Sequence, residues 1–377
     1  MIEMKNHRAV AYIDLKILEE NYRVIKSRLS EDVRILCVVK ADAYGHGMIQ
    51  VAGKLESMGA DYLGVATISE GMQLRSNNIS IPVLVMSGIM PWEDVQQALD
   101  NDLTPAVHDM DMLRKIKDAS FLQDKTVNIH LKVDTGMGRL GFHPDSMFSV
   151  IEEIKEAPHI RIEGIMSHFS SSEIKDEYGM EQIKIFQNIL QLFQNNGIKT
   201  NLNHMANSGA IGNYPEAHFN MVRVGINLYG SYTDVRLKKG FPLKQVMKLI
   251  SRIALLKEFP PGYSLSYGRS YITEKNTTIA CIPIGYADCY PRALSNKGSV
   301  LIKDKRCNVV GRVCMDWILV DVTDIEGVSA GDEVILLGNG NTDAITADEM
   351  AHLTGTIPYE ILCKISGRVP RIYHEAP

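Results

Sequence analysis

The chain has 377 residues, of which 45% are hydrophobic, and this is enough for one large core and a second domain. Its formal net charge of -5 does not suit a nucleic-acid binder, so we expect no nucleic-acid partner. No apolar run approaches the roughly 18 residues of a membrane span, and the first residues hold no uninterrupted apolar segment of a secretory signal. We therefore expect a cytoplasmic protein with no membrane partner.

Cysteines give no sign of a disulfide framework or a metal site. The six are Cys37, Cys281, Cys289, Cys307, Cys314 and Cys363, and no two of them form a CxxC pair. Several lie inside apolar, strand-like runs. We expect reduced, mostly buried cysteines and no bound metal.

Short apolar runs alternate with helical segments through the first two-thirds of the chain. The clearest helix is 179–196, where apolar residues recur at helical spacing and Gly197 can end the helix. Eight strand-like runs alternating with helices indicate parallel βα units, and the count of eight favours a closed (β/α)8 barrel of the TIM type. An open, doubly wound sheet is the alternative, but no GxGxxG follows the first strand. The runs are 33–40, 62–68, 82–87, 103–108, 127–133, 161–168, 199–205 and 221–229.

After about residue 240 the pattern changes to strands separated by turns, with one helix expected near 346–353. We therefore predict an α/β chain with a barrel over 12–237 and a mainly β C-terminal domain over 238–377. The N-terminal segment 1–11 is expected to pack on the β domain, because the early run 9–15 can pair there. The strand-like runs of this part are 245–256, 278–284, 299–302, 309–313 and 318–322.

Polar residues follow the predicted barrel strands, and in such barrels the chemistry takes place at the C-terminal ends of the strands. The first strand ends at Lys40, and the fifth carries Lys132 and leads to Arg139. The later strand ends hold His168, Asn207, Ser208, Arg223 and Gly225.

Lys40, which closes an apolar run, allows two interpretations. A single lysine at a strand end is more often ion-paired, or extends its charged end to solvent. Alternatively it is an amine desolvated enough to lose its proton, since burial favours the neutral form of a group whose ordinary pKa is about 10.4. A neutral amine can attack an aldehyde and form a Schiff base. Gly45 and Gly47 permit a ligand to approach the backbone closely, but the segment alone leaves both interpretations open.

A second cluster follows the eighth strand. Gly225 and Ile226 stand where barrels often bind a phosphate through backbone N–H groups. Ser208 and Tyr44 could add hydroxyl donors, and Arg223 could face a ring nitrogen or an anion. A simple turn at Gly225 and a surface ion pair at Arg223 are the alternatives. A Schiff-base lysine beside a phosphate site suggests a pyridoxal-phosphate enzyme or a class I aldolase.

The segment Val38-Val-Lys-Ala-Asp-Ala-Tyr-Gly-His-Gly47 closely resembles the cofactor-lysine signature of the alanine racemases, which are fold-type III pyridoxal-phosphate enzymes. The resemblance covers nearly the whole chain, and it implies a barrel, a β domain and pyridoxal 5'-phosphate as the cofactor. Further segments that match in order are 134–141, 204–208, 223–230, 266–268, 285–288, 311–316 and 357–359.

Two residues carry the reaction that the resemblance implies. Lys40 corresponds to the lysine that binds the cofactor and acts as a base on one face of the substrate Cα. Tyr267 corresponds to the base on the opposite face, and it comes from the other chain of a head-to-tail homodimer. Two opposed bases suit racemisation, because a single base would return the proton to the face it left.

Other residues are implied to bind the substrate and the cofactor. Arg139 corresponds to an arginine that contacts the substrate carboxylate, and Lys132 to a lysine that is often carbamylated and bridges to that arginine. The implied cofactor ligands are Tyr44, Asn207, Ser208, Gly225, Ile226 and Tyr359, together with His168 and Arg223 at the pyridine ring. Met315 and Asp316 match substrate-side residues of the second chain, and the implied entrance consists of Glu173, Tyr286, Arg292, Ile357 and Tyr359.

Three positions depart from the family pattern. Cys289 stands in place of a glycine, and Val224 in place of a proline. Glu173 stands where an aspartate is common. None of these residues is one of the two implied bases, so we expect them to affect substrate access more than reaction type.

The resemblance implies an isomerase that interconverts L-alanine and D-alanine and supplies D-alanine for peptidoglycan. A serine or broad-specificity amino-acid racemase of the same fold is the nearest alternative. A decarboxylase is less favoured, because Tyr267 supplies a second base that decarboxylation does not need. A cofactor-carrying protein without turnover would resemble the first domain only.

Overall fold

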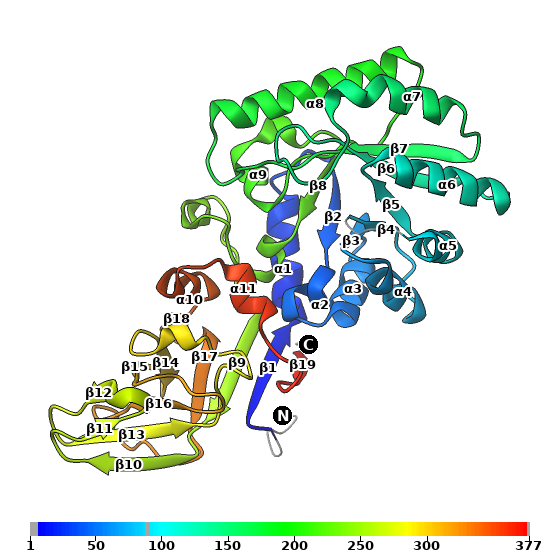
Figure 1. The fold of residues 1–377 in the computed structure, drawn as a ribbon. Coiled ribbons are helices and arrows are strands. Elements are labelled where there is room, and N and C mark those ends of the chain that lie inside the picture. The colour runs from blue at the N-terminus through cyan, green and yellow to red at the C-terminus, as the bar shows by residue number, and fades with distance from the viewer. Residues whose placement is uncertain (1–6, 87–90, 375–377) are drawn as a thin grey trace.

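The computed structural model describes residues 7–86 and 91–374 (Figure 1). Seven parallel strands form a curled sheet in the order β7-β6-β5-β4-β3-β2-β8. They are β2 (Arg34–Val38), β3 (Tyr62–Val65), β4 (Val83–Val85), β5 (Thr104–Val107), β6 (Val127–Lys132), β7 (Ile160–Met166) and β8 (Met221–Val224).

The predicted strand 199–205 forms only an isolated parallel bridge, between Met166 and His204. Its backbone nevertheless joins the two ends of the sheet, because His204 N donates to Ile165 O at 3.0 Å and Arg223 N donates to Ala206 O at 2.9 Å. The segment is not a regular strand, since the side chain of Asn203 accepts the bond from Ile165 N–H that a backbone carbonyl would otherwise take. The predicted (β/α)8 TIM-like barrel is confirmed, with one irregular position.

Helices cover the outside of the barrel strands (Figure 1). The predicted helix 179–196 is confirmed as α8 (Glu177–Asn195), whose N-terminus is capped by the carboxylate of Asp176. The other helices of this region are α1 (Leu15–Lys26), α2 (Lys40–Gly45), α3 (Met48–Ser57), α4 (Ile68–Ser76), α5 (Trp92–Asp100), α6 (Met110–Leu122), α7 (Met147–Lys155) and α9 (Ser208–Asn213). Short 3-10 helices are η2 (Pro144–Ser146), η3 (Pro215–Ala217), η4 (Ile226–Tyr229), η5 (Val235–Lys239), η6 (Tyr267–Arg269) and η7 (Arg292–Leu294).

The rest of the chain is mainly strand, as predicted. Its sheet has the order β10-β13-β16-β15-β14-β17-β9-β1-β19, with β18 paired to β17. The strands are β1 (Ala9–Asp14), β9 (Met247–Arg252), β10 (Leu255–Phe259), β13 (Thr277–Ile282), β14 (Ser299–Ile302), β15 (Lys305–Val310), β16 (Ile318–Asp321), β17 (Glu333–Asn339), β18 (Ala344–Ile345) and β19 (Arg371–His374). A separate hairpin pairs β11 (Ser264–Leu265) with β12 (Tyr271–Ile272), and the helices are α10 (Ala347–Thr354) and α11 (Pro358–Cys363).

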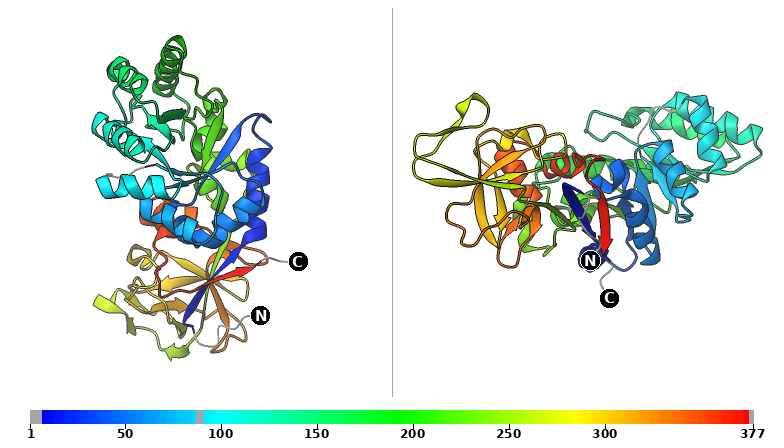
Figure 2. Two further views of the ribbon diagram at one scale, coloured as in Figure 1. Left: turned by 90° about the vertical axis from the view of Figure 1, so that its right-hand side faces the viewer. Right: turned by 90° about the horizontal axis from the view of Figure 1, so that it is seen from below.

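Both chain ends contribute strands to this sheet. β1, which precedes the barrel, pairs antiparallel with β9 and parallel with β19 at the other end of the chain (Figure 2). β1 runs across the boundary predicted between residues 11 and 12. Residues 1–6 of the predicted N-terminal segment lie outside the described residues.

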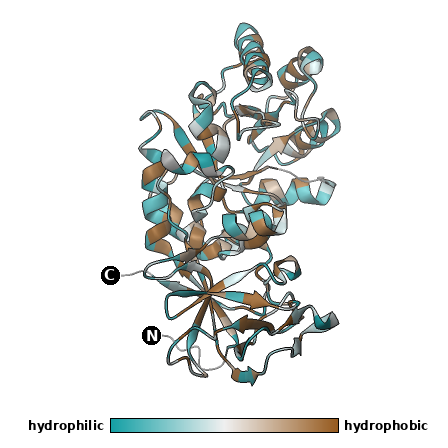
Figure 3. Ribbon diagram, turned by 90° about the vertical axis from the view of Figure 1, so that its left-hand side faces the viewer, coloured by the Kyte–Doolittle hydropathy of each residue, from teal (hydrophilic) through white to brown (hydrophobic). Residues whose placement is uncertain are grey.

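Some expected strands differ in extent. The run 245–256 divides into β9 and β10, and the strand expected at 309–313 is β15, which starts earlier and ends before Gly311. β17 and β19 were not predicted. Hydrophobic residues lie along the strands of the C-terminal sheet, whereas the barrel helices carry both hydrophobic and hydrophilic residues (Figure 3).

All six cysteines lie among the described residues and none forms a disulfide, as expected. Three of them, Cys37, Cys289 and Cys307, are buried. Across residues 7–86 and 91–374, no helix is both long enough and apolar enough to span a bilayer.

Candidate active site

A cavity of about 580 Å³ lies at the C-terminal ends of the barrel strands. It contains many of the side chains that the sequence singles out, although they come from distant parts of the chain. The predicted residues that line it are Lys40, Tyr44, Lys132, Arg139, His168, Glu173, Asn207, Ser208, Arg223, Gly225, Ile357 and Tyr359. Residues that the sequence did not suggest complete the wall: Val38, Met86, Met137, Leu140, Met166, Phe169, Ser170 and Ser172.

Lys40 stands at the start of an unusual turn. From Ala41 to Tyr44, four successive residues have φ between 50° and 54°, so the turn is left-handed. Each such residue costs about 1–2 kcal/mol, and the surrounding hydrogen bonds must offset this. Ala41 N donates to Glu70 Oε1 at 2.7 Å, and Met48 N donates to Asp42 Oδ1 at 2.8 Å. The turn brings both Lys40 and Tyr44 to the cavity.

The cavity is electrostatically positive. Burial lowers the pKa of Lys40 from its ordinary value, and the guanidinium of Arg139 lowers it further. Burial and the charges of Arg223, Arg139 and Lys40 lower the pKa of Lys132 to about 8. Glu173 supplies the one carboxylate among the described residues that line the cavity. Such a cavity favours anionic ligands and keeps amines partly neutral.

A compact polar site lies where β8 ends. Gly225 N donates to Ser208 Oγ at 2.9 Å, and a Cβ at Gly225 would lie 2.8 Å from the hydroxyl oxygen of Tyr44. A side chain at this position would therefore displace the hydroxyl of Tyr44, whose ring packs edge-on against Tyr359. Asn207 does not present its Oδ1 freely to a ligand, because this atom caps α9 by accepting from Ala210 N.

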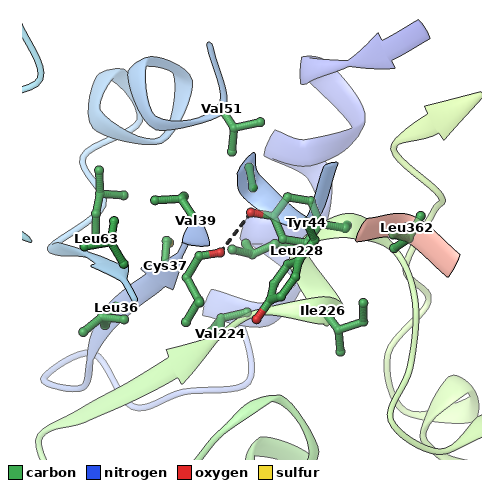
Figure 4. Packing of buried hydrophobic residues seen from close by; sticks show 14 of the residues in the cluster. Leu36, Cys37, Val39, Tyr44, Val51, Leu63, Val224, Ile226, Leu228 and Leu362 are labelled. Carbon is green, nitrogen blue, oxygen red and sulfur yellow. Dashed lines mark hydrogen bonds between the residues drawn. The ribbon is translucent and has the colours of Figure 1, made fainter. Parts of the chain in front are cut away.

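Ile226 is fully buried and is not among the residues that line the cavity. It packs in the same buried apolar cluster as Tyr44 (Figure 4). Val224, which replaces the family's usual proline, is also fully buried in this cluster, and it pairs with Cys37 of β2. The valine side chain at position 224 thus packs in the core.

Arg223 is buried and fully engaged at its terminal nitrogens. Nη1 donates to Nδ1 and to the carbonyl of His204, both at 3.1 Å. Nη2 has two N–H groups for three acceptors, Nδ1 of His168 at 3.0 Å and the carbonyls of Ser167 and Met205, so one N–H is shared between two of them. Since a guanidinium has only donors, Nδ1 of each imidazole must accept, which requires that nitrogen to be unprotonated. Burial and the charge of Arg223 keep the pKa of His168 and His204 well below the ordinary value, so both rings are neutral.

The sequence assigned no role to His204 or to His130, whose Nδ1 lies 2.8 Å from His204 Nε2. One sequence signal could have indicated His130. It precedes Lys132 by two residues on β6, so both side chains point to the same face of the strand.

Besides Ile226, five further predicted residues lie outside the cavity lining of their own chain. Tyr267, in η6, is 68% exposed, and Met315 and Tyr286 are also exposed. Asp316 accepts a hydrogen bond from Arg368 at 2.8 Å, and Arg292 is exposed at the start of η7. The structure of one chain therefore does not bring these residues to Lys40.

The two other departures have structural explanations. Cys289 is buried without a left-handed backbone, so a side chain fits where the family has glycine. Glu173 lines the cavity and is held in place by Ser172 N, which donates to Oε2 at 2.9 Å.

Comparisons with known proteins agree with this architecture. The family described as "Alanine racemase, N-terminal domain" matches residues 13–233, and the one described as "Alanine racemase, C-terminal domain" matches residues 246–373. An alanine racemase of Clostridium perfringens is 43% identical over 96% of this chain and 94% of its own length. Alanine racemase 2 of Caldanaerobacter subterraneus is 42% identical over 96% of this chain and 93% of its own length.

Solved structures give the same result. The alanine racemase of Clostridium difficile has a TM-score of 0.90 at 39% identity and covers 97% of this chain and 96% of its own. That of a D-cycloserine-producing Streptomyces lavendulae has a TM-score of 0.93 at 33% identity, covering 99% and 98%. The fold and these matches define an isomerase of the racemase type. The chain belongs to the alanine racemase family, and the resemblance that the sequence indicated is confirmed.

Proposed function

We propose that the chain interconverts L-alanine and D-alanine with pyridoxal 5'-phosphate bound in the 580 Å³ cavity. The observation that carries this proposal is the convergence of Lys40, an amine of lowered pKa, with a hydroxyl-rich anion site and a buried arginine in one cavity. The three features correspond to the aldehyde, the phosphate and the pyridine nitrogen of that cofactor.

The residues present fit this group. A Cβ at Gly225 would displace the Tyr44 hydroxyl, and the hydroxyls of Tyr44 and Ser208 lie beside the backbone there, as a phosphate site requires. We assign the phosphate to Tyr44, Ser208, Gly225 and Tyr359, with Asn207 nearby, and to the backbone N–H of Ile226, whose side chain is buried outside the cavity. We assign the pyridine ring to His168 and Arg223. When bound, pyridoxal phosphate withdraws electrons from the Cα of an attached amino acid and so acidifies its Cα–H bond.

Two residues would move the proton. Nζ of Lys40 takes or returns it on one face of Cα, and the phenol of the partner subunit's Tyr267 does so on the other. The high exposure of Tyr267 and its absence from the cavity of its own chain support a shared site in a homodimer. Each base then faces one enantiomer, and the net result is inversion.

Charged residues would tune these bases. A tyrosine has an ordinary pKa of about 10 and is a poor base unless a nearby positive charge lowers it, and Arg139 is free to supply that charge. Arg139 would also bind the substrate carboxylate. Lys132, with a pKa of about 8, is partly neutral near neutral pH. Its amine could add to carbon dioxide with release of one proton, and the resulting carbamate would pair with Arg139.

Arg223 would control reaction type. Nη1 and Nη2 are engaged within the protein, so Nε–H would donate to the pyridine nitrogen, and a guanidinium that remains protonated disfavours protonation of that nitrogen. This restrains electron withdrawal and suppresses transamination. The neutral Nδ1 of His168 holds Arg223 in place on the cavity side.

The substrate would be a small amino acid. We assign Met315 and Asp316 of the partner subunit to the substrate side, and Glu173, Tyr286, Arg292, Ile357 and Tyr359 to the entrance. In the cell we propose a cytoplasmic role, the supply of D-alanine for peptidoglycan.

Chiral analysis of products from a panel of L-amino acids, with pyridoxal phosphate added, tests the proposal. We expect alanine to be racemised with the highest kcat/KM. A higher kcat/KM for serine would make the chain a serine or broad-specificity racemase. A bound-cofactor absorption band without turnover of any amino acid would make it a cofactor carrier.

A further inference from the structure

Gln182 of α8 is completely buried, although its amide has four hydrogen-bonding positions to satisfy. Its Oε1 accepts from the backbone N–H and from the hydroxyl of Ser170, both at 3.1 Å. Its Nε2 donates to the hydroxyl of Thr135 at 3.3 Å and to the carbonyl of His168 at 3.2 Å. One side chain thus joins the loop after β6, the end of β7 and the loop that follows His168.

The orientation of this amide is determined by its neighbours. Ser167 Oγ donates its only proton to the carbonyl of Val133 at 2.9 Å. Thr135 must therefore be the donor in the 2.7 Å bond between the Thr135 and Ser167 hydroxyls, and it accepts from Gln182. A flipped amide would place its oxygen against the carbonyl of His168. Only one arrangement satisfies every group.

Tyr178 holds the same loop from one turn earlier on α8, and residues four apart lie on one helix face. Its hydroxyl donates to the carbonyl of Gly136 at 3.0 Å. Gly136 has a φ of 133°, and a Cβ at this position would collide with that hydroxyl. α8 therefore contacts two consecutive residues of the loop, Thr135 through Gln182 and Gly136 through Tyr178.

The loop is held together by its own hydrogen bonds and ends in a cation, Arg139, that has no protein partner among the described residues. Asp134 Oδ1 accepts from the N–H groups of Gly136 at 2.9 Å, Met137 at 2.8 Å and Gly138 at 3.1 Å. Arg139 comes next and lines the cavity. Within the described ranges its guanidinium makes no hydrogen bond or ion pair, so it is available to a ligand.

We propose that Gln182, assisted by Tyr178, is a positioning residue for substrate recognition. It holds the Arg139 loop at a fixed distance from His168, so that the guanidinium meets a substrate carboxylate where Lys40 reaches Cα. The inference rests on the proposed function, in which Arg139 binds that carboxylate. Neither Gln182 nor Tyr178 lines the cavity, so both act through the loop.

The test compares Gln182→Met and Tyr178→Phe with Gln187→Met, which alters an exposed glutamine of the same helix. Arg139→Lys reports on the carboxylate contact itself. The measurements on the holoenzyme are kcat and KM for both alanine enantiomers, and inhibition by propionate, which is alanine without its amino group. Hydrogen exchange of the amides of residues 136–138 gives a readout that does not depend on activity.

We expect Tyr178→Phe to raise KM and the propionate inhibition constant about fivefold, the equilibrium effect of one net hydrogen bond. Gln182→Met should raise both by tenfold or more, roughly the effect of displacing a substrate-binding group by a fraction of an ångström. kcat should change less than KM. Exchange should become faster at residues 136–138 in both variants and remain unchanged in Gln187→Met.

The outcomes distinguish a failure of the proposed Arg139–carboxylate contact from a failure of the positioning role of Gln182. If Arg139→Lys leaves KM and propionate inhibition unchanged, the proposed carboxylate contact is wrong. If Arg139→Lys raises both while the α8 variants behave like Gln187→Met, the positioning role is wrong. Should Gln182→Met fail to fold, Tyr178→Phe decides, because it removes only a hydroxyl from a half-exposed ring.

Discussion

Nη1 of Arg223 lies 3.1 Å from Nδ1 of His204, and Nε2 of His204 lies 2.8 Å from Nδ1 of His130. Because the guanidinium can only donate, the direction of both bonds follows: Arg223 donates to His204, and His204 donates to His130. No carboxylate forms an ion pair with Arg223 among the described residues. Neutral imidazoles and carbonyls therefore stabilise a buried charge, and burial lowers the pKa of Arg223 to about 10.

The two imidazoles should differ in their contribution to stability. His204→Leu leaves an N–H of a buried cation unpaired, and we expect the free energy of unfolding to fall by about 3 kcal/mol. His130→Leu leaves a neutral imidazole N–H of His204 unpaired and removes the 3.5 Å contact of His130 Nε2 with Glu163, which keeps its bond from Tyr62, so we expect a smaller loss of about 1 kcal/mol. Urea denaturation of both variants at one protein concentration measures the difference. Equal losses would contradict the assigned direction of the bonds.

Lys132 should make stability depend on pH. Its folded-state pKa of about 8 lies below the ordinary value of 10.5, so between these values the folded chain binds fewer protons than the unfolded chain. Stability therefore rises with pH through this window and is lower below pH 8. A fall of the Lys132 pKa from 10.5 to about 8 corresponds to about 3 kcal/mol between pH 7 and pH 11.

Urea denaturation of the cofactor-free protein in degassed buffer at pH 7 and pH 9.5 checks this, with Lys132→Met as the comparison. We expect the variant to be more stable than the original chain at pH 7, and this advantage to shrink at pH 9.5. A pH dependence that is the same in both proteins would show that Lys132 is not the titrating group.

A glycine should relieve the backbone strain of the left-handed turn after Lys40. Ala41 is exposed with a φ of 53°, a conformation that costs an L-residue about 1–2 kcal/mol and glycine nothing. Glycine also increases the conformational entropy of the unfolded chain, which offsets part of this gain. Ala41→Gly should therefore leave stability unchanged or raise it by about 1 kcal/mol. Gln73→Gly in the right-handed α4 is the control and should cost about 1 kcal/mol. Thermal denaturation compares the two, and a similar loss in both would refute a strained turn.

The strands of the barrel could be predicted because each is a short apolar run bounded by polar or turn residues. The same reasoning located the end of the barrel where the cavity lies, and with it Lys40 and Arg223, which both line that cavity. The left-handed turn could not be predicted, because Ala-Asp-Ala-Tyr is a sequence that ordinary right-handed helices accept. Gly45 and Gly47 were the only residues of this segment that indicated an unusual backbone conformation.

Contacts between segments that are distant in the chain also could not be predicted from the sequence. His204 lies beside Arg223 because the irregular barrel segment that contains it is hydrogen-bonded to β8 in one particular register. In the sequence, Gln182 is one of several polar residues of an amphipathic helix. Its spacing does not distinguish it from Gln187, which is exposed. The buried position of Gln182 depends on where two loops meet, which is a property of the tertiary structure.

Tyr267 and Lys40 are separated within one chain. Tyr267 is 68% exposed and does not line the cavity that contains Lys40, so a two-base reaction requires a second chain. Lys40→Ala should abolish racemisation in both directions and the absorption band of the lysine-bound cofactor. Tyr267→Phe should keep that band but lose activity, more so when L-alanine is the substrate.

Mixing the two inactive variants under conditions that exchange subunits tests the shared site directly. A mixed dimer has one site with both Lys40 and Tyr267, and another site with neither. Random exchange makes half of all dimers mixed, and half of the sites in those are complete, so roughly a quarter of the original activity should return. The same mixture without subunit exchange is the control and should remain inactive. No recovery from confirmed mixed dimers would mean that both bases act within one chain, or that Tyr267 is not the second base.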